Sequence, residues 1–238
     1  MFKYIKNKIH ILQNIYIKNN YLIDKDTYAM DGEDLAIEKY SKNMIKGFYV
    51  DIGAHHPVQR SNTCLLYKKG WRGINVDLSK FSLDLFNYLR PEDINIQCAI
   101  SDIDGEIELF YQKEFSQLNT TDLKWAKENF NNNFKTQRIK CKTFNSLLSE
   151  TKYKNHKIDF LNVDVEGAEM KILSGLNFNI YDPSQICIEI LGYRHLNTLE
   201  EKEQALKSDP IYKFLTEKKY IKVWSGSSYC SHLFAKNI

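Results

Sequence analysis

The sequence lacks the features that mark several classes of protein. Its 33 basic and 30 acidic side chains leave a net charge of +3, which is too small for a dedicated nucleic-acid-binding protein. It has no C-x-x-C pair, and five cysteines, an odd number, fit neither a disulfide framework nor a zinc cluster. These absences favour a cytoplasmic protein with buried thiols and no nucleic-acid partner.

A long apolar run is also missing from the N-terminal segment, MFKYIKNKIHILQNIYIKNN. We therefore expect neither a signal peptide nor a membrane-spanning helix there. Apolar side chains do recur at helical spacing, and they are Phe2, Ile5, Ile9, Leu12 and Tyr16. The pattern predicts an amphipathic helical extension over residues 1–30 that packs on the domain or on a second copy in a homodimer. Reversible contact with a membrane surface is the less favoured alternative.

A third absence concerns glycine. Residues 49–57 read YVDIGAHHP, an apolar run followed by Asp51 and by the single glycine Gly53. A dinucleotide site needs the pattern G-x-G-x-x-G, and His55 and His56 stand where further glycines would be expected. A pyrophosphate-binding loop is therefore not expected. Because the two histidines are consecutive, we interpret them as loop residues at the mouth of a site rather than as a pair of metal ligands.

Apolar runs alternate with helical or loop segments along the remaining chain. The predicted strands are Phe48–Ile52, Gly73–Asp77, Asn95–Ile100, Ile158–Val163 and Gln185–Leu191. This alternation predicts one α/β domain over residues 31–238, with a parallel sheet covered on both faces. The C-terminal segment KKYIKVWSGSSYCSHLFAKN predicts an antiparallel hairpin at the end of that sheet.

Helix signals lie between these strands. Asp31 is a candidate N-cap for a helix that continues to about Met44. A second helix is expected between Pro57 and Gly70, and a third begins at Ser79.

Two further segments carry structural signals. The Asp-Gly turn in SDIDGEIELFY predicts that a strand over 107–111 folds back on the strand that ends near Ile100. Residues 112–136 are polar and rich in Asn, so we expect a mobile insertion or lid there.

Acidic residues follow three successive predicted strands, at the end of the sheet where ligands bind in open α/β folds. Asp51 and Gly53 end the first, Asp77 ends the second, and Ser101 and Asp102 follow the third. S-adenosylmethionine fits this set, because it has a positive sulfonium, a zwitterionic amino-acid part and no phosphate. We expect Asp77 to accept hydrogen bonds from the ribose hydroxyls and Asp102 to accept one from the adenine amine.

Several blocks of the sequence resemble the FkbM-type methyltransferase family. They are GEDLAIEKY, GFYVDIGAHHPVQRSNTCLLYKKGWRGINVDLS, AISDIDGEIELF and KTFNSLL…KIDFLNVDVEGAEMKILSGL. The resemblance implies a class I, Rossmann-like methyltransferase fold: a three-layer α/β sandwich with a mostly parallel seven-stranded sheet and an antiparallel last strand. It also implies S-adenosylmethionine as methyl donor and O-methylation of sugars or polyketide-type natural products.

Carboxylates after the fourth and fifth strands are the candidates for the chemistry. Asp164 ends the fourth strand, Glu166 begins the segment that follows, and Glu189 lies at the end of the fifth, before His195. Two mechanisms stay open: Asp164 or His195 acts as general base on a hydroxyl, or Asp164 and Glu189 hold Mg²⁺ or Mn²⁺ that lowers the hydroxyl pKa. Glu166 is either catalytic or a helix-start residue.

We therefore expect an S-adenosylmethionine-dependent O-methyltransferase that acts on a sugar or a nucleotide-linked sugar. The alternatives are O-methylation of a lipid or polyketide-type product and, less favoured, a non-catalytic partner protein with the same fold. The polar segment SQLNTTD within 112–136 favours a sugar acceptor over an apolar one.

Overall fold

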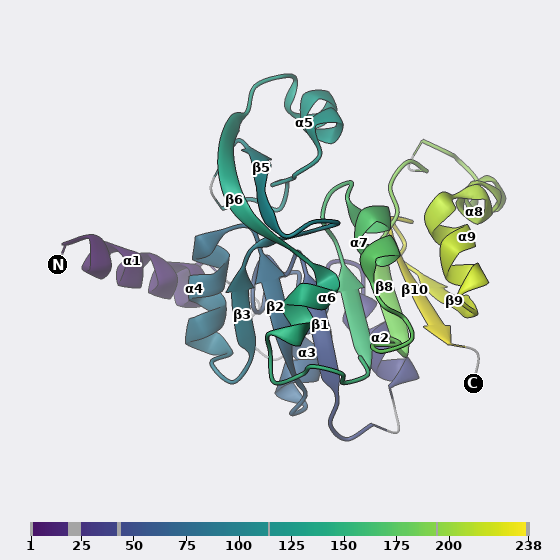
Figure 1. The fold of residues 1–238 in the computed structure, drawn as a ribbon, viewed down its shortest axis with the longest axis horizontal. Coiled ribbons are helices and arrows are strands. Elements are labelled where there is room, and N and C mark those ends of the chain that lie inside the picture. Colours follow the sequence, from purple (N-terminus) through teal and green to yellow (C-terminus); the bar gives the residue numbers. More distant parts are fainter. Residues whose placement is uncertain (1, 19–24, 42–43, 114, 194, 237–238) are drawn as a thin grey trace.

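The computed structural model describes residues 2–18, 25–41, 44–113, 115–193 and 195–236. Its centre is a seven-stranded sheet in the order β3–β2–β1–β7–β8–β10–β9 (Figure 1). The strands are β1 (Phe48–Ile52), β2 (Arg72–Asp77), β3 (Ile94–Gln97), β7 (Phe160–Val163), β8 (Gln185–Glu189), β9 (Tyr220–Ser225) and β10 (Ser231–Lys236). Only β10 runs antiparallel to its neighbours, β8 and β9. The predicted fold class and the C-terminal hairpin are confirmed.

Helices cover both faces of this sheet, which explains why its central strands are apolar along their whole length. All five residues of β1 are buried: Val50 packs in the cluster that contains α6, α7 and α9, and Tyr49 packs with α2 and α3. The helices are α1 (Phe2–Leu12), α2 (Glu33–Tyr40), α3 (Cys64–Lys68), α4 (Lys80–Leu89), α5 (Leu123–Phe130), α6 (Phe144–Ser149), α7 (Glu169–Gly175), α8 (Leu199–Ser208) and α9 (Pro210–Glu217).

Two of the three helix predictions need correction. The side chain of Ser79 caps α4 as predicted, by accepting a hydrogen bond from the backbone N–H of Ser82. Asp31 is not an N-cap, because its carboxylate accepts from the backbone N–H of Ser228 at 2.8 Å and from the hydroxyl of Ser227, both in the C-terminal hairpin. The helix predicted between Pro57 and Gly70 is reduced to the short α3, and residues 54–63 form a loop.

A second, smaller sheet replaces the hairpin predicted between the strand that ends near Ile100 and the strand over 107–111. Its strands β4 (Ala99–Ser101), β5 (Gly105–Tyr111) and β6 (Lys135–Thr143) lie in the order β4–β6–β5. The prediction that β5 pairs with the preceding strand is wrong, because β6 lies between β4 and β5 and pairs with both. The strand predicted over 95–100 is divided at Cys98, where the chain leaves the main sheet for the small one.

The segment between β5 and β6 is folded onto the small sheet. Within it α5 buries Ala126 and Phe130, which pack against Phe110 of β5. Thr120 pairs with Phe110 in an isolated antiparallel bridge. The segment therefore has apolar anchors of its own, and its role as a lid stays a prediction.

Of the helical extension predicted over residues 1–30, residues 2–17 are helical: α1 continues into a π-helical turn, η1 (Gln13–Ile17). Residues 25–30 are not helical, and 19–24 lie outside the described residues. The face that packs on the domain differs from the predicted one. Ile11 and Ile15 contact Leu85 of α4, whereas Ile5 and Ile9 of the predicted apolar stripe are exposed. In the part of the chain that the structure describes, no helix is long and apolar enough to cross a membrane.

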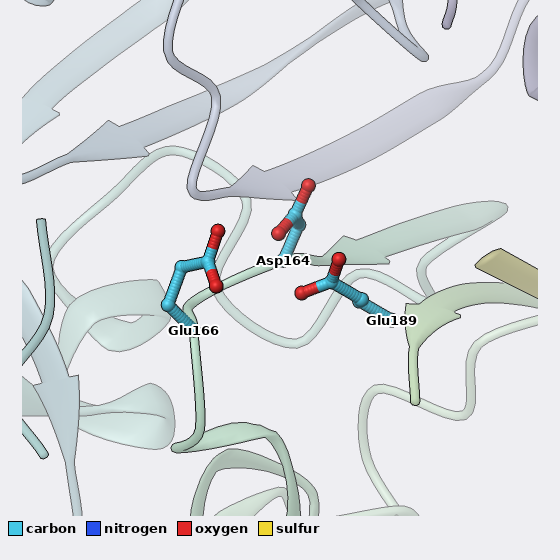
Figure 2. Close-up of side chains that lie close together, drawn as sticks. All are labelled: Asp164, Glu166 and Glu189. Atoms are coloured by element: carbon cyan, nitrogen blue, oxygen red, sulfur yellow. The ribbon is translucent and has the colours of Figure 1, made fainter. Parts of the chain in front are cut away.

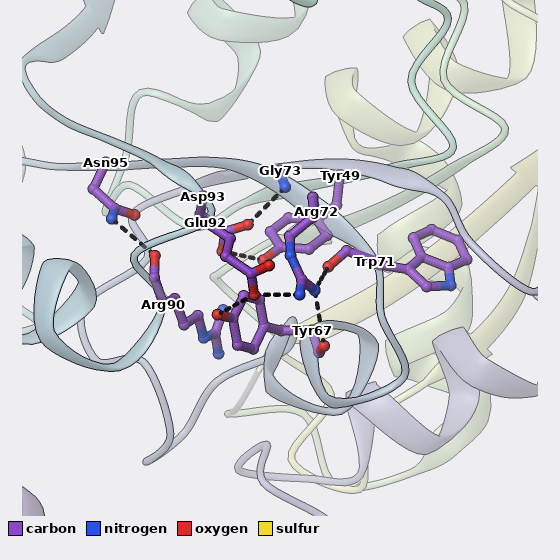
Figure 3. A network of polar contacts seen from close by, with 9 residues as sticks. All are labelled: Tyr49, Tyr67, Trp71, Arg72, Gly73, Arg90, Glu92, Asp93 and Asn95. Carbon is purple, nitrogen blue, oxygen red and sulfur yellow. Dashed lines mark hydrogen bonds and ion pairs between the residues drawn. The ribbon is translucent and has the colours of Figure 1, made fainter.

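A buried carboxylate joins three strands at the opposite end of the sheet from the acidic cluster described below. Figure 3 shows Asp93, which accepts hydrogen bonds from the Tyr49 hydroxyl and from the backbone N–H of Gly73 at 2.8 Å. The amide of Asn75 donates a third bond at 3.0 Å. The adjacent Glu92 is exposed and pairs with Arg72. Asp93 thus accepts hydrogen bonds from three buried donors of β1 and β2. Glu92 pairs with Arg72 at the surface, where water can replace it as a partner.

This contrast predicts unequal costs for two neighbouring substitutions. Asp93→Ala should lower the free energy of unfolding by about 3 kcal/mol or more, because it leaves several buried donors without an acceptor. Glu92→Ala, the matched control, should cost about 1 kcal/mol or less, as exposed ion pairs do. Urea unfolding of both variants measures the difference, and equal costs would contradict the structural role given to Asp93.

Candidate active site

A cavity of about 340 Å³ lies where β1, β2, β7 and β8 end, within the size range of small-molecule sites. Most of the predicted site residues line it. They are Gly53, Asp77, Asp164, Glu166 and Glu189. The loop that follows β1 and the segment between β5 and α5 complete its wall. The structure thus brings together carboxylates from three strands that are distant in the sequence.

Gly53 occupies a position that no other residue can fill without a backbone shift. Its φ of +83° lies in the left-handed region, and its N–H donates to the carbonyl of Val76 at 2.9 Å. A Cβ at this position would lie 1.6 Å from the carbonyl oxygen of Asp164. The glycine therefore allows the loop after β1 to pass directly against the backbone at the end of β7.

Asp77 is held in a fixed orientation at the end of β2. One carboxylate oxygen accepts from the backbone N–H of Ser79 at 2.7 Å, and the other accepts from that of His55 at 2.8 Å. Burial raises the pKa of Asp77 to about 6, although these hydrogen bonds oppose the rise. Each oxygen still has a lone pair for a ligand hydroxyl.

Asp51 lies deeper than Asp77 and has protein partners on both oxygens. It accepts from the hydroxyl of Thr63 at 2.6 Å and from the amide of Asn162 at 2.9 Å. Thr63 in turn accepts from the buried guanidinium of Arg90 at 2.8 Å. Asp51 also lines a hollow of about 50 Å³ that shares Gly53 with the main cavity. It therefore anchors the loop that carries Gly53.

Three carboxylates converge in the cavity. Figure 2 shows the side chains of Asp164, Glu166 and Glu189 close together, and one oxygen from each lies within 4.8 Å of the other two. Burial, and then the negative charge of Glu189, raise the pKa of Asp164 well above its ordinary value. Glu169 points elsewhere, as predicted, because its carboxylate accepts from the backbone N–H groups of Val165 and Gly167.

The two histidines after Gly53, His55 and His56, have different structural roles. The ring of His55 stacks on Phe115, with centroids 4.8 Å apart, and lines the cavity. His56 is buried, and its Nδ1 accepts from the backbone N–H groups of Val58 and Gln59 at 3.1 and 2.9 Å. Desolvation lowers the pKa of His55 to about 4 and that of His56 to about 3, so both are neutral at pH 7. His55 thus shapes the cavity mouth and His56 holds the loop.

Three predicted site residues line neither the cavity nor the adjoining hollow. Ser101 is buried and donates to Asp102 at 2.9 Å, while Asp102 forms an ion pair with Lys171 at 2.8 Å. Cys98, Ala99 and Ile100, which come directly before them, do line the cavity, whereas the carboxylate of Asp102 turns to Lys171. His195 is exposed on the segment after β8 and lines neither the cavity nor the adjoining hollow.

Residues away from the strand ends line or support the site, and sequence reasoning did not single them out. Glu33 at the start of α2 lines the hollow beside Asp51. Arg60 donates to the amide oxygen of Gln117 at 2.6 Å, which joins the loop after β1 to the segment after β5. The hydroxyl of Thr120 donates to the carbonyl of Glu166 at 2.8 Å. No periodic pattern marks such residues, and only their presence in the blocks GEDLAIEKY, AHHPVQRSNT and SQLNTTD draws attention to them.

Comparison with known proteins identifies the family. Residues 51–221 match the model of the methyltransferase FkbM domain. The chain belongs to the FkbM methyltransferase family. The match spans β1 to β9 and includes every residue of the acidic cluster. No curated protein sequence matches the chain significantly.

Solved structures similar to this FkbM-family chain are distant from it in sequence. A methyltransferase FkbM from Methylobacillus flagellatus is 10% identical, with a TM-score of 0.49 over 98% of this chain and 59% of that one. This chain thus spans less than two thirds of that protein. An O-methyltransferase from Bacillus cereus, solved in complex with SAH, is 13% identical, with a TM-score of 0.46 over 97% of this chain and 90% of that one.

Proposed function

We propose that the protein transfers the methyl group of S-adenosylmethionine to a hydroxyl of a sugar or of a nucleotide-linked sugar. The observation that supports this proposal is the convergence of Asp164, Glu166 and Glu189 in the cavity that also contains Gly53 and Asp77. Bound S-adenosylmethionine supplies a methyl group already activated on a sulfonium. The protein must then position the acceptor and remove the proton of its hydroxyl.

The residues at the ends of β1 and β2 fit S-adenosylmethionine. Asp77 retains acceptor capacity for two ribose hydroxyls, and Gly53 lines the same cavity. No phosphate has to be bound, which agrees with a single glycine in this loop. Asp51 supports this site by holding the loop through Thr63.

The acceptor hydroxyl would be deprotonated by Asp164. When it is ionised, a carboxylate whose pKa is raised by burial and by Glu189 is a stronger base than one with an ordinary pKa. Glu166 and Glu189 would accept hydrogen bonds from neighbouring hydroxyls and so orient a sugar. The segment 112–136 would act as a lid, since Ser116, Gln117, Asn119 and Thr121 line the cavity with polar groups. A lipid or polyketide-type acceptor would form fewer hydrogen bonds with these groups than a sugar would.

A second version of the mechanism uses a divalent ion. Asp164 and Glu189, with Glu166 as a third ligand, offer only carboxylate oxygens, which suit Mg²⁺ or Mn²⁺. A bound ion would lower the pKa of an acceptor hydroxyl enough for its proton to pass to water, and Asp164 would then hold the ion instead of acting as base. Treatment with a chelator distinguishes the two versions.

The first prediction concerns the cofactor. Asp77→Ala should weaken binding of S-adenosylhomocysteine by about 1.5–3 kcal/mol, or roughly 10- to 150-fold, as expected for lost hydrogen bonds to a charged group. Affinity of the unaltered protein should be full above pH 6 and should fall below it, because the ionised Asp77 carboxylate binds the ribose and its pKa is about 6.

Calorimetry across pH 5 to 8 measures both effects. The affinity of the Asp77→Ala variant should lack the fall below pH 6 that the ionisation of Asp77 causes in the unaltered protein. Asp102→Ala is the matched control, since Asp102 pairs with Lys171 outside the cavity, and it should leave the affinity unchanged. An unaltered affinity in Asp77→Ala would remove Asp77 from the cofactor site.

The second prediction concerns the acceptor and the base. In a screen of nucleotide-linked sugars with methyl-labelled S-adenosylmethionine, label should pass to at least one sugar. Asp164→Asn should lower kcat by about 100- to 10,000-fold, the contribution of a general base, while cofactor affinity is retained. His195→Ala, whose side chain lies outside the cavity, should leave the rate unchanged.

Two outcomes of the same screen would redirect the proposal. Label in lipid or polyketide-type acceptors, and in no sugar, would replace the proposed acceptor class by the alternative one. Loss of turnover with chelator, and its recovery with Mg²⁺ or Mn²⁺, would select the metal version, whereas full turnover in metal-stripped protein would exclude it.

A further inference from the structure

The N-terminal helix is attached to the domain along one side only. Ile11 and Ile15 pack on Leu85 of α4, as described above. Three further contacts add to this attachment. The amide of Asn7 donates to Asp84 at 3.0 Å, the ring of His10 stacks on Phe81 with centroids 4.2 Å apart, and the ring of Tyr16 meets that of Tyr88 edge-on. α4 thus fixes the orientation of α1 and determines which of its faces remains open.

An apolar stripe lies on the open side. Ile5, Ile9 and Leu12 follow one another at helical spacing and are 47%, 50% and 42% exposed. Tyr16, which is 58% exposed, continues the stripe at its edge, where its ring also contacts Tyr88 of α4. Figure 1 shows α1 projecting from α4 away from the main sheet, with the N-terminus at the far end. Contiguous apolar side chains of this kind usually mark an interaction surface on a folded protein.

The charges around this stripe are all of one sign. Residues 1–23 contain no Asp or Glu, and they contain the lysines Lys3, Lys6, Lys8 and Lys18. At 100° per residue, Lys6 and Lys8 fall on opposite flanks of the stripe, and both are exposed. Long cationic side chains on both edges of an apolar face suit an interface with anionic headgroups, where the charges reach outward while the apolar face is buried.

We propose that α1 and η1 dock the protein reversibly on an anionic lipid surface. The stripe would enter the boundary between headgroups and acyl chains, and Lys6 and Lys8 on its flanks would contact the headgroups. A second copy of the same helix fits less well, because pairing two such stripes brings lysines against lysines with no acidic partner in either segment. This inference reverses the initial preference for a stripe packed on the domain.

The proposed membrane helix is also connected to the cavity. Phe115 packs in the same cluster as Ile11, Ile15 and Leu85, and its ring stacks on His55 at the cavity mouth. Docking through α1 would therefore hold the mouth of the cavity near the lipid surface. The proposal does not depend on methyl transfer and is tested separately from it.

Sedimentation with vesicles tests the proposal on the full chain. The protein should bind vesicles of equal parts phosphatidylcholine and phosphatidylglycerol, bind vesicles of phosphatidylcholine weakly, and dissociate at high salt. Ile5→Asp with Ile9→Asp should lower the affinity at least about tenfold, and so should Lys6→Glu with Lys8→Glu.

Matched controls carry the same changes elsewhere. Leu199→Asp alters a leucine that is 74% exposed on α8, and Lys207→Glu with Lys213→Glu alters exposed lysines on α8 and α9, and neither should change vesicle binding. All variants should bind S-adenosylhomocysteine normally, which shows that they are folded. Vesicle binding that survives the α1 substitutions would overturn the proposal. So would absence of binding combined with a dimer that the Ile5→Asp, Ile9→Asp variant dissociates, which would assign the stripe to a second copy.

Discussion

The carbonyl oxygen of Asp164 lies where a side chain on residue 53 would have to begin. The separation of 1.6 Å between this oxygen and an added Cβ means that the loop after β1 can take its course only with glycine. Parallel pairing of β1 with β7 sets the two backbones side by side, and Gly53 lets the loop pass over the end of β7. The arrangement of the cavity depends on this contact. It brings the loop after β1, whose backbone binds Asp77, close to the carboxylates at the ends of β7 and β8.

The second determinant of the site is an excess of negative charge in a confined space. Asp77, Asp164, Glu166 and Glu189 line the cavity, and Arg60 is the one Lys or Arg among the described residues that do so. Burial raises the pKa values of both aspartates, and the negative charge of Glu189 raises that of Asp164 further, which costs stability above those pKa values. A positively charged sulfonium would offset part of this repulsion when it binds. The site is thus suited to a cationic ligand. The burial and negative charge that favour such a ligand also make the ionised aspartates stronger bases.

Much of the site could be predicted because buried parallel strands are visible as apolar runs, and their ends locate Gly53, Asp77, Asp164 and Glu189. The prediction for Asp102 relied on the same rule, but the chain leaves the main sheet at Cys98 and the carboxylate turns to Lys171. The small sheet could not be foreseen, since the Asp-Gly turn favours a local hairpin while the pairing partner β6 lies more than twenty residues away. Residues supplied by loops, such as Arg60 and Gln117, follow no periodicity and become apparent only in three dimensions. For α1, the apolar pattern identified a helix correctly but not which side faces the domain.

The central claim is that the cavity at the ends of β1, β2 and β7 binds the methyl donor beside the three carboxylates. A crystal structure of the protein with S-adenosylhomocysteine tests this claim most directly. We expect the ribose hydroxyls on the carboxylate of Asp77 and the homocysteine part beside Gly53, on the side of the cavity that faces Asp164. Binding outside this cavity, or a pose in which the ribose makes no contact with Asp77, would contradict the account.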